Sequence, residues 1–200
     1  MAGTIICDYI RTDANQLSLN VGNTTFATIN ARGLLSNTGV TIIAANGVIS
    51  GAGTISKSAL PAGSVLQVVQ GITTTEVTSS LATYVNTGLS ASITPTSSSS
   101  KILVMVTHGT ITKSNGLSTN RVMLKLLRDS TDLYVFGNGL LYTATALQNR
   151  GSASFTYLDS PATTSSVTYK TQVANGDAAA EVQVQTNGSA STITLMEIAV

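Results

Sequence analysis

Charged side chains are scarce in this 200-residue chain, and this shortage excludes a class of partner. Charged residues make up 10% of the sequence, with 10 Lys and Arg against 9 Asp and Glu, and the formal net charge is +1. A nucleic-acid binder presents clustered basic residues, whereas these are scattered from Arg11 to Lys170. We therefore expect no direct contact with nucleic acid. Depletion of charge is instead typical of a surface that other subunits cover.

Cysteine and histidine occur once each, and tryptophan is absent. Cys7 cannot form a disulfide within the chain, and we interpret it as a small buried side chain. A Ser–His–Asp relay would have to use His108, and a metal site built on several His or Cys ligands is impossible. The surrounding sequence VTHGT favours a histidine at a strand end that is solvated or bonded to the backbone.

The nine carboxylates give no catalytic pattern. Asp129 and Asp132, in RDSTD, could hold a calcium ion if loop carbonyls converged on them, but a turn capped by its own Asp side chains is favoured. Glu197 is unusual because it lies on the same strand face as Ile193 and Leu195, and a partner in another subunit would explain it. No glycine-rich phosphate loop is present. We predict no enzyme activity and no catalytic, cofactor-binding or metal-binding residues.

Long apolar runs are also missing, since no stretch approaches the roughly 20 residues of a membrane span. The opening sequence MAGTIICDYIRTD has only a short apolar run and carries Asp8 early, unlike a secretory signal. We expect a chain that is made in a cytoplasm and does not insert into a membrane.

Threonine and serine are abundant, filling 55 of 200 positions, and the mean hydropathy is +0.28. Apolar and polar residues alternate in three runs within Ser166–Val200, and such a period of two predicts half-buried strands. Asn175-Gly176 and Asn187-Gly188 separate the runs, and both pairs tolerate the positive φ of hairpin turns. The pattern predicts three antiparallel strands joined by tight turns.

Further strands are expected upstream. The segment Lys101–Thr107 is apolar on both faces, which predicts a central strand buried on both sides. Other candidate strands are Ser64–Gln70, Ala82–Pro95, Arg121–Arg128 with Leu133–Phe136, and Ala153–Leu158. Nine or ten strands without helices predict an all-β, antiparallel two-sheet sandwich. A jelly roll is favoured over an immunoglobulin sandwich, which would carry a tryptophan and a cysteine pair.

Residues 1–58 differ from the rest because glycines divide them into short apolar pieces. Strands are expected at Phe26–Ile29, Val40–Ala44 and Gly47–Ile49, too few and too short for an independent core. The segment KSALPAG, at 57–63, predicts a joint. We expect an extended, glycine-punctuated β arm over 1–58, which attaches to another chain or intertwines with copies of itself, and a jelly-roll-like sandwich over 59–200.

Several segments together resemble a group of bacteriophage virion proteins, frequent in phages of aquatic bacteria including cyanobacteria. They are MAGTI (1–5), LPAGSVLQVVQ (60–70), TGLSASITPTSSSSKILVMV (87–106), LLRDSTDL (126–133), LDSPATTSSVTYKTQV (158–173) and STITLMEIAV (191–200). The resemblance implies a virion location and a homotrimer of jelly-roll heads, similar to tumour-necrosis-factor-like folds, with an N-terminal attachment segment. It transfers no catalytic residue.

Two placements in the virion remain open. A capsid decoration (cement) protein would grip the major capsid protein through its arms and stabilise the assembled shell, since a ligand of one state stabilises that state. A tail fibre or appendage would instead bind host surface glycans through its C-terminal head, with avidity from three sites. The first is favoured because no heptad or fibrous repeat predicts a shaft. A polysaccharide depolymerase is disfavoured by the sparse acids.

Overall fold

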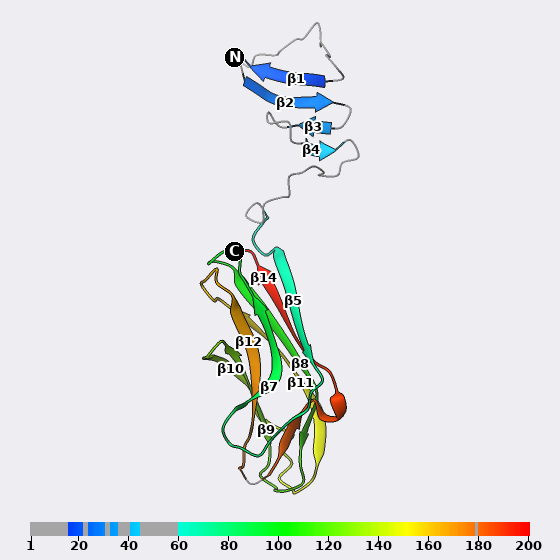
Figure 1. Ribbon diagram of the computed structural model, residues 1–200, viewed down its shortest axis with the longest axis vertical. Helices are drawn as coiled ribbons and strands as arrows, with labels where there is room; N and C mark the ends of the chain where they lie inside the picture. Colours follow the sequence, from blue (N-terminus) through cyan, green and yellow to red (C-terminus); the bar gives the residue numbers. More distant parts are fainter. Residues whose placement is uncertain (1–15, 22–23, 31–32, 36–40, 45–59, 179) are drawn as a thin grey trace. The chain divides into compact units, whose positions relative to one another are not determined.

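The computed structural model describes residues 16–21, 24–30, 33–35, 41–44, 60–178 and 180–200. The chain divides into two compact units, Met1–Ser56 and Lys57–Val200 (Figure 1). The first unit contains a four-stranded sheet of order β1-β2-β3-β4, in which all neighbours are antiparallel. Its strands are β1 (Gln16–Val21), β2 (Thr24–Asn30), β3 (Gly33–Leu35) and β4 (Thr41–Ala44).

Two of the three strands expected in this unit coincide with β2 and β4. The third, Gly47–Ile49, lies outside the described residues, as does Cys7. The role of residues 1–58 as an attachment arm remains a prediction.

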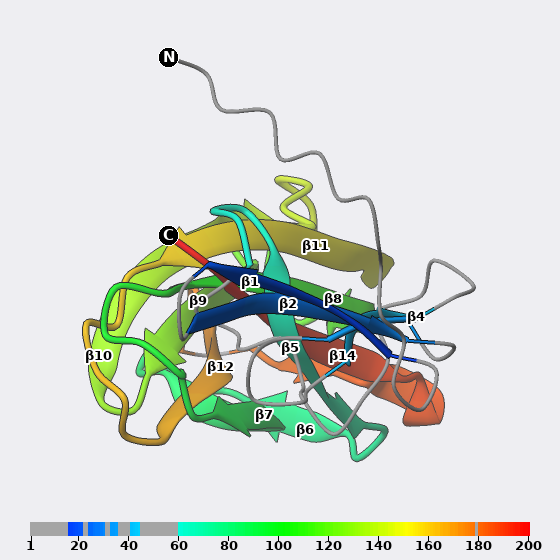
Figure 2. The same ribbon diagram turned by 90° about the horizontal axis from the view of Figure 1, so that it is seen from above.

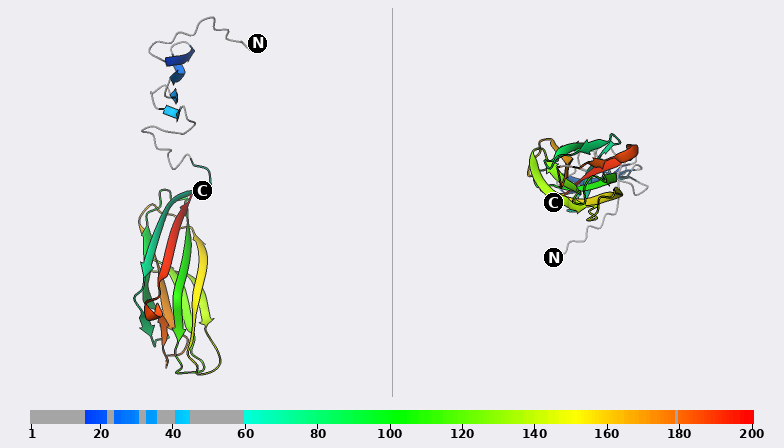
Figure 3. Two further views of the ribbon diagram at one scale, coloured as in Figure 1. Left: turned by 90° about the vertical axis from the view of Figure 1, so that its right-hand side faces the viewer. Right: turned by 90° about the horizontal axis from the view of Figure 1, so that it is seen from below.

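The second unit is built from ten strands, with no α-helix among its described residues, and Figure 3 shows its long strands from the side. The strands are β5 (Val65–Thr73), β6 (Val77–Ser79), β7 (Val85–Ile93), β8 (Lys101–Lys113), β9 (Val122–Arg128), β10 (Thr131–Leu140), β11 (Asn149–Asp159), β12 (Val167–Asn175), β13 (Val182–Val184) and β14 (Ser191–Ile198). A short 3-10 turn, η2 (Thr186–Gly188), lies between β13 and β14.

These strands form two antiparallel sheets packed face to face, seen end-on in Figure 2. The first sheet has the order β5-β14-β8-β11, with β6 and β13 continuing it beside the far end of β8. The second has the order β10-β9-β12-β7. The chain passes between the sheets in the sequence that defines a jelly roll. The two-sheet sandwich predicted from the sequence is therefore confirmed.

Strand β8 is the central strand that the apolar run predicted. It pairs with β14 and β13 along one edge and with β11 along the other. Its inward side chains Ile102, Val104 and Val106 are fully buried, whereas Leu103 and Met105 on the outer face are only half-buried. The expectation of burial on both sides was thus half right, because no described residue of the second unit covers the outer face of this sheet.

Neither of the two hairpins expected between the last three strand runs forms. The run before Asn175-Gly176 is β12 in the second sheet, and the run after it is β13 in the first sheet, so these strands do not pair. β13 and β14 do not pair with each other but follow one another along the same edge of β8, at Ile111–Lys113 and Lys101–Thr107. Asn187 (φ 58°) and Gly188 (φ 70°) have the positive φ that was expected, but they interrupt one strand rather than reverse it. β5 and β6 are interrupted at the same level, opposite β14 and β13.

The core between the sheets consists of two apolar clusters. The larger contains Leu89, Ala91, Ile93, Ile102, Val104, Val106, Leu126, Val167, Tyr169, Ile193 and Leu195. The smaller contains Ile111, Val122, Leu124, Ala153, Val173, Val182 and Val184. Both draw on the two sheets, so burial of these side chains holds the layers together.

One polar contact also joins the sheets. Asp159, at the end of β11, accepts hydrogen bonds from the Tyr169 hydroxyl at 2.7 Å and from Arg128 Nη1 at 2.6 Å, both on the opposite sheet. Burial and the Asp159 carboxylate raise the pKa of Tyr169 above its ordinary value. The phenol therefore stays a hydrogen-bond donor to a buried carboxylate at any ordinary pH.

The close approach of β5 to β7 depends on Gly71. A Cβ atom at this position would lie 2.1 Å from the backbone oxygen of Ser90. We expect Gly71→Ala to lower the free energy of unfolding by about 2 kcal/mol or more, because the backbone of one sheet must move. Urea denaturation measures the effect. Ser92→Ala, at an exposed position of β7, is the control, and equal stability of the two variants would contradict this packing.

Candidate functional site

His108 lies inside β8 and not at a strand end. Its side chain is fully buried, and its ring stacks on Phe136 with centroids 6.3 Å apart. The expectation of a solvated or backbone-bonded histidine was wrong, because the strand continues past Gly109 to Lys113. The neighbour of Nδ1 is the side chain of Gln185 at 3.3 Å, and Nε2 has no hydrogen-bond partner among the described residues.

Gln185 ties together the strands that are interrupted at this level. With its amide nitrogen donating to the carbonyls of Thr75 (3.3 Å) and Val184 (3.2 Å), its oxygen accepts from His108 Nδ1 and from Ser191 Oγ at 2.9 Å. Gln185 itself has a positive φ of 56°. The arrangement links three interrupted strands to β8, so His108 serves the fold in the described part of the chain, with no carboxylate placed to orient it as in a catalytic triad.

The two aspartates of the possible calcium loop have separate partners. Asp129, with φ 52°, begins the turn between β9 and β10, and its carboxylate accepts the Thr168 amide at 2.9 Å. Asp132 forms an ion pair with Lys125 at 2.9 Å. The described residues contain no group of three or more His, Cys, Asp or Glu side chains able to hold a metal ion. A turn forms here, but the expectation that its own Asp side chains cap it was wrong, because Asp129 bonds to β12 and Asp132 pairs with Lys125 on β9.

Glu197 is fully buried, as its apolar neighbours suggested, but its partners lie within the same chain. Its carboxylate accepts hydrogen bonds from the Thr96 amide (2.7 Å), the Thr96 hydroxyl (2.6 Å) and Gln67 Nε2 (2.6 Å). Burial alone would raise the pKa of Glu197, but hydrogen bonds from Thr96, Ser100 and Gln67 hold it below its ordinary value. The expected partner in another subunit is therefore unnecessary, and that hypothesis was wrong.

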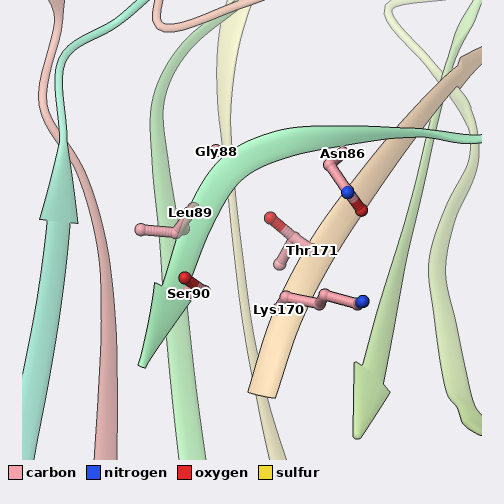
Figure 4. A pocket seen from close by; sticks show the side chains of 6 residues that line it. All are labelled: Asn86, Gly88, Leu89, Ser90, Lys170 and Thr171. Carbon is pink, nitrogen blue, oxygen red and sulfur yellow. The ribbon is translucent and has the colours of Figure 1, made fainter. Parts of the chain in front are cut away.

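A small hollow of about 130 Å³ lies on the outer face of the second sheet, between β7 and β12 (Figure 4). The pairing of Lys170 with Ser90 and of Gln172 with Asn86 leaves three residues of β7 opposite Thr171 alone. This bulge, at Gly88 with φ 79°, opens the hollow. Lys170, Asn86 and Ser90 supply polar groups around it. The hollow is smaller than a usual ligand pocket.

The outer face of the first sheet carries a row of apolar side chains that the described residues do not cover. Val68, Met196, Leu103 and Leu158 are directly paired across β5, β14, β8 and β11, and they form one row. Val68 is 54% exposed and Leu158 51%, while Met196 and Leu103 are half-buried. Ile72, 65% exposed, lies on the same side of β5. We call this surface the apolar face.

The outer face of the second sheet has a different chemistry. Lys125 pairs with Asp132 and lies over the ring of Tyr84, at 4.4 Å from its centroid. Side-chain hydrogen bonds also join Gln172 to Asn86 at 2.9 Å across β12 and β7. This is an ordinary solvated sheet face, so the two outer faces differ in what they can bind.

A third surface is the aromatic side of the sandwich, where β10 and β11 form the edges of the two sheets. The ring of Tyr134 lies 5.8 Å from that of Tyr157 and 6.1 Å from that of Phe155, and Phe136 stacks on Phe155 at 3.7 Å. Tyr134 is 47% exposed. Two of the six tyrosines, which are scattered in the sequence, are thus brought together with two phenylalanines where β10 and β11 lie side by side.

The second unit is therefore a jelly-roll sandwich with a row of apolar side chains on the outer face of one sheet and a polar outer face on the other. No protein-family model matches the sequence, and no curated protein matches it. The described residues include no helix long and apolar enough to cross a lipid bilayer.

Several solved structures share part of the strand arrangement. They include the VP2 subviral particle of infectious bursal disease virus (11% identity, 92% of this chain and 42% of that chain, TM-score 0.43). The structure of the Gt strain of the same virus has 14% sequence identity, the match covers 79% of this chain and 44% of that chain, and the TM-score is 0.36. The T13 particle of this virus has 13% sequence identity, the match covers 84% of this chain and 49% of that chain, and the TM-score is 0.34. The chain spans less than half of the length of each of these proteins.

Buried, neutral His108 should make stability depend on pH. Burial lowers the pKa of His108 to about 4 from an ordinary 6.5, so the unfolded chain binds the extra proton between these values. We expect the free energy of unfolding to fall by about 3 kcal/mol as the pH drops from 6.5 to 4. Urea denaturation across this range tests it. His108→Asn should lack this component, and an unchanged pH slope in the variant would contradict the assignment.

The hydrogen bonds to Glu197 should stabilise the fold only while its carboxylate is charged. Because the folded pKa lies below the ordinary 4.5, this contribution is present above pH 4.5 and is lost as the pH falls through the folded pKa. We expect Glu197→Gln to cost about 2 kcal/mol at pH 7, and less at pH 3. Thermal unfolding at both pH values measures this, with exposed Glu181→Gln as control. An equal cost at both pH values would argue against it.

Proposed function

We propose that the chain is a non-enzymatic structural protein of a bacteriophage virion, made in the host cytoplasm. In this proposal it is a homotrimeric capsid decoration (cement) protein with a head over residues 59–200. Residues 1–58 bind the major capsid protein and stabilise the shell. The observation that carries the proposal is the apolar face, which a protein working alone in water would have little reason to expose.

The polar chemistry of the head supports a structural role. His108 is buried under Gln185, Glu197 is held by Thr96 and Gln67, and Asp159 joins the two sheets. Each of these groups has a folding partner, and none of the three is presented to a substrate. Low charge over the whole chain is the composition expected of a subunit covered by its neighbours.

The segments that resemble phage virion proteins also support the proposal. Those in the head coincide largely with strands, among them β5, β8, β12 and β14, and with the β9–β10 turn at Asp129. The resemblance therefore involves the framework of the sandwich and is not confined to one loop.

The stabilising mechanism would be mass action on the assembled shell. Arms that bind only where several capsid subunits meet favour the closed shell over its separated parts. Three arms joined by one trimer bind together, so that each raises the effective concentration of the others. Such a protein needs a robust head and an attachment segment, and it needs no catalytic group.

A tail fibre or appendage is the second candidate, and the hollow between β7 and β12 favours it. Lys170, Asn86 and Ser90 offer one cation, one amide and one hydroxyl on the solvated face. Such a set suits a polar group of a host surface glycan. Three weak sites in a trimer would add through avidity.

The placement is tested on intact particles of the phage that encodes the chain. Antibodies against the purified full chain, detected with gold, should label the whole head of the particle. Particles lacking the chain should release their DNA at a lower temperature and recover when purified protein is added. Gold confined to the tail would instead favour the glycan-binding appendage. Unlabelled particles would rule out a virion protein.

A further inference from the structure

The apolar face and the aromatic side meet at one corner of the head. Leu158 ends the apolar row on the outer face of β11, and the next residue along the strand, Tyr157, points to the other face of the sheet and stacks on Tyr134. Apolar surface thus continues from the sheet face around the β11 edge to β10.

Symmetry limits how such surfaces can be used by identical copies. A surface that packs only on itself gives a twofold dimer, whereas a closed ring needs two different patches that complement each other. The head has two such patches, and they face different directions from one corner. Copies joined through two patches that face different directions turn at every contact, and they close into a ring when the turns add up to a full circle.

We propose that the apolar face of one copy receives the aromatic side of the next, and that three such contacts close the ring. The occupant of the apolar face is therefore a second copy of this chain. This inference rests on the homotrimer of the proposed function and adds which surfaces form it.

The chemistry of the two patches agrees with this pairing. Val68, Ile72 and Leu158 contribute aliphatic surface, and Tyr134 with Tyr157 contributes rings whose edges and hydroxyls tolerate partial hydration. Neither group includes a charged side chain, so the contact removes no unpaired charge from water, which would cost several kcal/mol. A typical charged protein surface would complement the apolar face poorly.

The size of the apolar face limits what one contact contributes. Four strands about 4.8 Å apart and the five residues from Val68 to Ile72, at about 3.3 Å rise each, cover roughly 320 Å² in projection. Each copy in a ring makes two contacts, one through each patch. A single contact is smaller than the roughly 800 Å² per partner of a standard interface, and closure of the ring, in which three contacts act together, adds the further stability.

The mass of the purified full chain in solution gives the first test. Light scattering after gel filtration at 50 μM should give three times the 20.5 kDa of one chain. Val68→Asp with Ile72→Asp, on the apolar face, should give monomers, and so should Tyr134→Asp on the aromatic side. Leu147→Asp, at a residue 59% exposed in the β10–β11 loop, is the matched control and should remain trimeric. Far-ultraviolet circular dichroism checks that each variant is folded.

Mixing the two defective variants distinguishes a ring from a self-packing face. The face variant still has an intact aromatic side, and Tyr134→Asp still has an intact apolar face. Their equimolar mixture at 200 μM should form a dimer with one copy of each, detected by native mass spectrometry, and should stop there. If Tyr134→Asp alone forms dimers, the apolar face packs on itself and the inference is wrong.

Two further outcomes would also overturn it. A monomeric wild-type chain at 50 μM would remove the interface, as would a mixture that stays monomeric. The virion placement is judged separately by the gold labelling. A trimer with these contacts that is missing from particles would overturn the proposed function and leave the interface standing.

Discussion

The antiparallel hydrogen bonding along both edges of β8 is the constraint on which the rest of the head depends. This one strand fixes β14 and β13 on one side and β11 on the other, and its inner residues reach the core that holds the second sheet. Its outer residues then have to lie on the uncovered face. A strand that is apolar on both faces therefore has one face buried in the core and one face that the described residues leave uncovered.

Local patterns predicted the strands well because alternation and turn residues act over a few positions. The run over Ala82–Pro95 became β7, and Asn187 and Gly188 adopted positive φ. Which strands pair was not predictable in the same way. The residues between β13 and β14 are compatible with a hairpin turn or with a break in one continuous strand. Pairing of both strands with β8, about 80 residues earlier in the chain, selects the break.

For the buried polar residues too, the local pattern was predictable from the sequence and the distant partners were not. Glu197 was recognised as anomalous from its apolar neighbours, but its partners Thr96 and Gln67 lie 101 and 130 residues away. His108 was assigned to a strand end because the predicted strand stopped at Thr107, although β8 continues to Lys113. The alternation of Leu103 and Met105 with buried residues indicated a second apolar side of β8. The sequence alone did not show that the described residues of the head leave this side uncovered.

The chain enters and leaves the head at the same end, where β5 begins beside the end of β14. The Gly63 amide donates to the Ala199 carbonyl at 2.8 Å and the Ala199 amide to that of Ser64 at 2.9 Å, and the pairing continues to Thr73. A pull on Ser64 along the strand axis therefore loads this whole ladder of hydrogen bonds in shear. A shear load has to break many bonds together, whereas peeling breaks them one by one. The geometry suits a head that must hold while its tether is under tension.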